Sequence, residues 1–286
     1  MQWYGRRQSS NIEDRRGSPV RRGIVGGGLG TIVLLLIAMF FGFDPSYILD
    51  QTTVDTIGTN PEASSPADEN TKQFVATVLA YTEDTWSNVF RSMGRTYAEP
   101  RLVLFTGAVE SACGFGQAAM GPFYCPSDQK VYLDMSFFQE LSDRFKAPGD
   151  FAQAYVIAHE VGHHVQNLLG ISDQVERIRR RSSPEQVNAA SVRLELQADC
   201  LAGVWGARTE HAEQSQLREF LETGDVEEAL RAASMIGDDR LQMQSQGYVV
   251  PESFTHGTAK QRLRWFKQGF ESGNVSQCNT FEAPEL

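Results

Sequence analysis

Apolar residues recur every three or four positions through much of the second half of the chain, which is the period of an amphipathic helix. Residues 151–169 carry one such apolar stripe, made of Ala154, Ala158, Val161, Val165 and Leu168, and are predicted to form a half-buried helix. Similar spacing predicts helices over 71–95, 135–146, 184–210, 212–222, 226–235 and 258–271, and short strands are expected at 102–105 and 130–134. The predicted class is α+β: a mostly helical domain with a small antiparallel sheet.

A different pattern opens the chain. Residues 1–22 contain six arginines, and residues 23–43 then run for 21 positions without a charge, which is long enough to span a bilayer as a helix. Because arginines favour the cytoplasmic side, the pattern predicts a cytoplasmic segment (1–22), a transmembrane anchor (23–43), a Pro-containing polar linker (44–70) and a domain outside the cytoplasm (71–286). The expected location is the inner or plasma membrane, as a single-pass protein. A cleaved signal peptide is the alternative, but residues 40–44 offer no small-x-small cleavage site.

The predicted helix at 151–169 contains the most specific motif of the chain. Three of the five histidines lie within six positions, in His159-Glu160-Val161-Gly162-His163-His164. His159 and His163 are one turn apart, so their imidazoles can bind one metal ion, and Glu160 lies about 100° around the axis beside that ion. This H-E-x-x-H spacing predicts a zinc hydrolase, with Glu160 as the general base for a zinc-activated water. His164 points away and is expected to be structural; a solvated or core histidine cluster is the alternative for the whole motif.

A catalytic zinc needs a third protein ligand, and the second predicted metal-binding element is the helix at 184–210. Glu195 and Asp199 are four residues apart there, so one carboxylate can bind the metal while the other accepts the outer N–H of a ligating histidine. Ala198, Ala202 and Gly203 are small and are expected to let this helix approach the histidine helix closely. The alternative is that the two carboxylates are ordinary exposed helix charges.

These segments together resemble a known group of enzymes. The E-x-x-x-D element after H-E-x-x-H looks like that of the gluzincin metallopeptidases, and this resemblance implies that Glu195 is the third ligand and Asp199 its hydrogen-bonding partner. The segments HEVGHHVQ, ELQADCLAG, GPFYCPSDQKVYLD and FTHGTAKQRLRWF resemble the bacterial putative neutral zinc metallopeptidases over nearly the whole chain. The resemblance implies a membrane-anchored zincin. It also makes His256 a candidate for stabilising the oxyanion, with a loop or capping role as the alternative.

The four cysteines are expected to form two disulfides, because the domain is predicted to lie outside the cytoplasm. Three pairings are possible. The pairs Cys113–Cys125 and Cys200–Cys278 are the ones predicted here. No C-x-x-C occurs, so a cysteine zinc site is not expected.

The leading hypothesis is an endopeptidase whose substrate is an extended peptide, held by one of the two predicted strands at the rim of the cleft. The acidic net charge of −10 argues against nucleic acid as a partner. A di-iron carboxylate site would need a second E-x-x-H, and neither His211 nor His256 has a glutamate three residues before it. The remaining alternative is a catalytically silent zinc-binding scaffold for a protein partner, against which the presence of Glu160 weighs.

Overall fold

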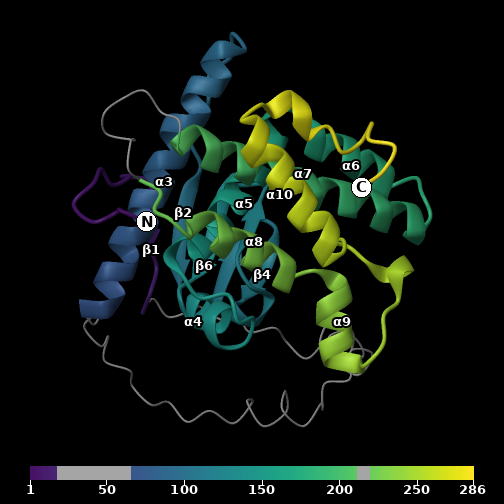
Figure 1. Cartoon of the computed structure of the whole chain (residues 1–286), viewed down its shortest axis with the longest axis horizontal. Helices are drawn as coiled ribbons and strands as arrows, with labels where there is room; N and C mark the ends of the chain where they lie inside the picture. Colours follow the sequence, from purple (N-terminus) through teal and green to yellow (C-terminus); the bar gives the residue numbers. More distant parts are fainter. Residues whose placement is uncertain (18–65, 211–219) are drawn as a thin grey trace. The chain divides into compact units, whose positions relative to one another are not determined.

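Helices make up most of the computed structural model, which describes residues 1–17, 66–210 and 220–286 (Figure 1). The helices of this part of the chain are α3 (Pro66–Ser92), α4 (Ser136–Asp143), α5 (Asp150–Leu168), α6 (Ile171–Arg179), α7 (Pro184–Glu210), α8 (Asp225–Met235), α9 (Asp238–Gln246) and α10 (Ala259–Ser272). The strands are β1 (Ile12–Asp14), β2 (Arg101–Phe105), β3 (Ala108–Ser111), β4 (Gly114–Gln117), β5 (Phe123–Cys125) and β6 (Lys130–Asp134). The predicted α+β class and the two predicted strands, β2 and β6, are confirmed. Most of the predicted helix at 212–222 lies outside the described residues.

The main sheet has the strand order β1-β2-β6-β5. Strand β2 pairs in parallel with both β1 and β6, and only β5 pairs antiparallel, with β6. The prediction of a small antiparallel sheet is therefore wrong for this sheet, although β3 and β4 form a separate antiparallel pair. The segment between β2 and β6 contains the β3–β4 hairpin and β5, and this long connection lets the chain return in the same direction.

Helix α5 lies in the middle of this unit and contacts α3, α6, α7, α8 and the sheet (Figure 1). Its predicted apolar stripe is buried, apart from the partly exposed Leu168 at its end. Gly162 faces the backbone of Ala198 on α7, where a Cβ atom would lie within 3.1 Å of the Ala198 carbonyl oxygen. A close approach of α5 and α7 therefore depends on glycine at this point. Gly203, expected to serve the same contact, instead faces Phe266 of α10.

Both predicted disulfides are present. Cys113 is bonded to Cys125, which joins the β3–β4 hairpin to β5, and Cys200 is bonded to Cys278, which joins α7 to the C-terminal segment. The described residues contain no free cysteine.

The N-terminal segment corrects the membrane prediction. Residues 1–16 belong to the same unit as residues 65–286, and Ile12 to Asp14 pair with β2, so no membrane can separate the two segments. Two of the arginines that suggested a cytoplasmic leader are paired with the domain: Arg7 with Glu83 and Asp84, and Arg16 with Glu69. Arg21 and Arg22 lie outside the described residues. The predicted single-pass topology and its membrane location are therefore wrong.

The predicted anchor itself, residues 23–43, lies outside the described residues, as do residues 44–65 of the predicted linker. Residues 66–70 belong to α3, so the predicted linker extends too far. Among the helices that are described, none combines the length and the apolar character needed to cross a bilayer.

Candidate metal centre

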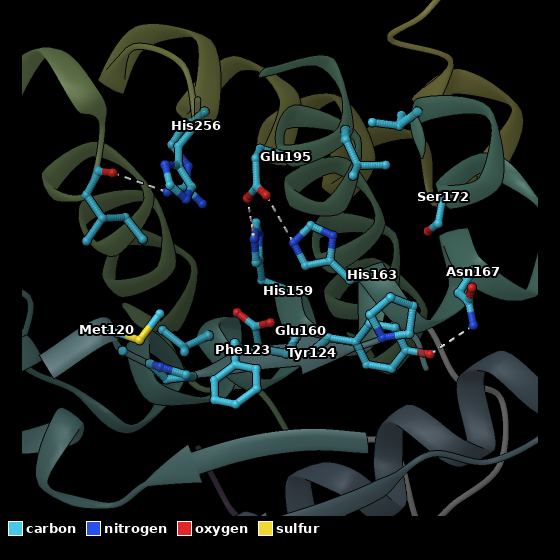
Figure 2. Close-up of a pocket in the computed structure, with 18 of the residues that line it drawn as sticks. Met120, Phe123, Tyr124, His159, Glu160, His163, Asn167, Ser172, Glu195 and His256 are labelled. Atoms are coloured by element: carbon cyan, nitrogen blue, oxygen red, sulfur yellow. Dashed lines mark hydrogen bonds and ion pairs between the residues drawn. The ribbon is translucent and has the colours of Figure 1, made fainter. Parts of the chain in front are cut away.

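Helices α5 and α7 bring the three predicted metal ligands together (Figure 2). Nε2 of His159 lies 3.1 Å from Oε2 of Glu195, and Nε2 of His163 lies 3.5 Å from Oε1 of the same carboxylate. One donor atom from each residue falls within 4.8 Å of the others, which is close enough for all three to bind one ion. The two helices thus present two imidazole nitrogens and a carboxylate to one point in space.

The outer nitrogens of both histidines are held by side chains of the surrounding helices. Nδ1 of His159 lies 2.8 Å from Oδ1 of Asp199, as predicted for a partner that fixes the ring. Nδ1 of His163 lies 2.8 Å from Oε1 of Gln166, whose amide nitrogen in turn donates to the carbonyl of Leu194. With both Nδ1–H groups directed outward, both Nε2 atoms face Glu195.

The carboxylates favour a positive charge at this point. Burial lowers the pKa of His159, but Asp199 and Glu195 outweigh it and raise that pKa to about 10. Burial alone would raise the pKa of Glu195, but His163 and His159 outweigh this effect and bring the pKa well below its usual range. A cation, whether a proton or a metal ion, is therefore stabilised between these three residues.

Asp199 is itself held by a buried network that the sequence did not reveal. Arg262 of α10 donates from Nε to Oδ2 of Asp199 at 2.8 Å and from Nη2 to Oδ1 at 2.9 Å. The hydroxyl of Tyr155, one turn before His159 on α5, also donates to Asp199. Burial raises the pKa of Asp199, and Arg262 more than reverses this and lowers it to about 2. Asp199 therefore stays ionised and accepts from His159.

His164 points to the opposite side of α5 from the predicted metal ligands and joins three segments. Its Nε2 lies 2.6 Å from the carbonyl oxygen of Ala98, and its Nδ1 lies 2.9 Å from the hydroxyl of Tyr124 on β5. Asn167 donates to the same hydroxyl at 3.1 Å. Burial lowers the pKa of His164, so this ring is neutral. The expected structural role of His164 is consistent with these contacts.

A cleft of about 870 Å³ runs past the predicted metal ligands. Glu160 lines it beside His159 and His163, and Figure 2 shows its carboxylate between these histidines and the β5 residues Phe123 and Tyr124. Among the described strands, β5 is one of the two edges of the main sheet, and β6 is its one neighbour. Neither predicted strand can offer a free edge, because β2 and β6 each have a strand on both sides. The prediction that one of them forms the rim is therefore wrong, and β5 takes that place.

His256 also lines the cleft and is exposed (Figure 2). It lies in the loop before α10, where the backbone N–H groups of Thr255, His256 and Gly257 donate to Asp238. Nδ1 of His256 lies 3.3 Å from Oδ1 of Asp238. Burial lowers the pKa of His256, but the Asp238 carboxylate raises it by more, so the pKa lies above its ordinary value.

Comparison with known proteins agrees with this arrangement. Residues 1–281 match the model of a family described as "Putative neutral zinc metallopeptidase". The chain belongs to this family. The chain is similar to the uncharacterized protein YpfJ of Escherichia coli (strain K12): the two are 50% identical, and the match covers 98% of this chain and 99% of the relative. It is also similar to an uncharacterized protein of Mycobacterium tuberculosis (strain H37Rv), with 39% identity over 87% of this chain and 86% of the relative. No solved structure matches this chain.

Proposed function

We propose that this member of the zinc metallopeptidase family is an active zinc-dependent endopeptidase in which His159, His163 and Glu195 hold the metal. The observation that carries the proposal is the convergence of both Nε2 atoms and the Glu195 carboxylate, with Glu160 beside them in an open cleft. Two imidazoles and one carboxylate are the donor set of catalytic zinc sites, which leave one position for water or substrate. The partners on both Nδ1 atoms favour metal binding further, because they fix the tautomer that leaves Nε2 free.

Bound zinc would lower the pKa of water and polarise a peptide carbonyl. Glu160 acts as the general base, because it adjoins His159 in sequence but points into the cleft rather than at Glu195 (Figure 2). It accepts a proton from the attacking water and passes that proton to the leaving amine. A purely structural zinc site has no use for a carboxylate at this place.

The edge of β5 supports an extended peptide as the substrate. A peptide laid along a free strand edge is held by backbone hydrogen bonds, which are largely independent of its side chains. Phe123 and Tyr124 of β5 face the metal ligands across the cleft, so a peptide placed on this edge would pass beside Glu160. His256 lies on the far side of this path, where an N–H donor would stabilise the oxyanion that forms when water attacks the carbonyl.

Hydrolysis of denatured casein by the full chain tests the proposal. The full chain is required, because residues 1–16 supply β1. We expect casein cleavage that stops with 1,10-phenanthroline, returns with added zinc, and falls by about 10² or more in Glu160→Gln while zinc content is unchanged. A zinc-loaded wild-type protein that cleaves no more than Glu160→Gln would instead identify a zinc-binding scaffold.

A further inference from the structure

The row of cleft-facing residues on α5 continues beyond the metal ligands. Asn167 follows His163 by four residues, as His163 follows His159, so all three lie on one face of the helix. Asn167 is half-buried and lines the cleft, and Figure 2 shows it beyond His163, next to Ser172. The amide of Asn167 therefore faces the path along which a peptide would leave the metal centre.

Hydrogen bonds hold the Asn167 amide against the Tyr124 hydroxyl. The His164 ring lies behind this hydroxyl: its Nε2 donates to the carbonyl oxygen of Ala98, which can only accept, and its Nδ1 lies 2.9 Å from the Tyr124 oxygen. His164 thereby fixes the place of the hydroxyl. The amide nitrogen of Asn167 donates to this hydroxyl at 3.1 Å.

The hydrogen bond to Tyr124 sets the orientation of the Asn167 amide. Its nitrogen is directed at Tyr124, and Figure 2 shows its oxygen on the other side, toward Ser172. An amide without such a partner could turn over and present either group. Asn167 instead presents an acceptor to the cleft, and an extended peptide offers N–H groups at regular intervals.

We propose that Asn167 is a substrate-binding residue whose side-chain oxygen accepts one backbone N–H of the peptide, and that His164 and Tyr124 position it. The inference rests on the proposed function, because it assumes that a peptide lies in this cleft. It adds a specificity: proline has no N–H, so the peptide position that meets Asn167 excludes proline.

The test uses a fluorescently labelled casein peptide and a series in which each backbone amide in turn is replaced by an ester, which removes one N–H. Binding is measured on the full-length, zinc-loaded Glu160→Gln protein, with and without Asn167→Ala. We expect one ester position that weakens binding by about 10-fold when Asn167 is present and has no further effect in Asn167→Ala, as for the loss of one hydrogen bond. Proline at that position should weaken binding in the same Asn167-dependent way.

Two tyrosine variants separate positioning from general damage. Tyr124→Phe frees the Asn167 amide to turn, so we expect roughly two-fold weaker peptide binding with unchanged zinc content. Tyr132→Phe is the matched control. It removes the hydroxyl of Tyr132 on the adjoining strand β6, which donates to Asp128 in the turn between β5 and β6, and should leave both quantities unchanged.

The outcomes distinguish this inference from the proposed function. Casein cleavage by the wild type, with no ester position whose effect depends on Asn167, would overturn the inference alone. Peptide binding with an Asn167-dependent position, but no cleavage by the wild type, would overturn the proposed function and support the inference.

Discussion

Replacing Arg262 with leucine should destabilise the metal-free protein severely. Arg262 is 2% exposed and Asp199 is completely buried, so the change leaves an ionised carboxylate inside the protein. Oδ1 of Asp199 keeps its bonds to Tyr155 and His159, but Oδ2 loses its bond to the Arg262 Nε. Breaking one side of a buried ion pair costs about 3–5 kcal/mol, a large part of the 5–15 kcal/mol that typically stabilises a protein.

The assay is urea unfolding of the full chain in EDTA, with the disulfides intact. With a slope of about 3 kcal/mol per molar urea, the expected loss lowers the midpoint by about 1–2 M. Arg264→Leu is the matched control, since Arg264 is exposed on the same helix, and we expect a change within about 0.5 kcal/mol.

A double variant identifies the cause of the loss. Adding Asp199→Asn to Arg262→Leu removes the buried carboxylate whose Oδ2 has lost its donor, so the double variant should be more stable than Arg262→Leu alone. The reasoning is refuted if Arg262→Leu unfolds at the wild-type midpoint, or if Asp199→Asn makes it less stable still.

Three further predictions concern the metal, the reaction and acid stability. Glu195→Ala should abolish tight zinc binding, measured in competition with a chromogenic chelator. Gln166→Ala removes only the hydrogen-bonding partner of His163 and should weaken zinc binding by about 10 to 100-fold. Equal zinc affinities of the two variants would contradict this difference in roles. His256→Ala should lower kcat on casein by roughly 10²-fold with little change in KM, if its N–H contacts only the oxyanion; a change in KM alone would argue against that role. Arg16 lowers the pKa of Asp14, so the stability that Asp14 provides is present above the ordinary value of 3.8 and is lost as the pH falls further. The difference in unfolding midpoint between wild type and Asp14→Asn should therefore shrink below about pH 4.

The local part of the candidate site was accessible from sequence. The spacing of His159 and His163 on one helix, and of Glu195 and Asp199 on another, follows from helical geometry alone. Asn167 continues the same spacing on α5, so the sequence carries a signal for this residue as well. Arg262 could not be found this way, since its link to Asp199 depends on the packing of α10 against α7, far apart in the chain.

The errors in the fold have a similar physical origin. Strand β5 has only three residues, and Pro122 and Pro126 adjoin it, so no alternating pattern marks it. It forms because β6 lies beside it and a disulfide fixes its last residue, Cys125. The number and positive charge of the N-terminal arginines indicate a cytoplasmic leader, whereas their role depends on acidic partners such as Glu83 and Glu69. The disulfides were predicted correctly from an expected location that the structure does not support.

The return of residues 1–16 to the sheet changes what a cut in the chain would do. Residues 17–64 connect the two segments of one folded unit, residues 1–16 and 65–286. A single cleavage within residues 17–64 would therefore leave that unit made of two polypeptides, with neither removed from it. All four cysteines lie after residue 100, and no disulfide would link the two pieces. The strand pairing of β1 with β2 and the arginine ion pairs would hold them together instead. Such a nicked protein should migrate as two chains on a denaturing gel and as one particle in native mass spectrometry, with the arrangement of His159, His163 and Glu195 unchanged.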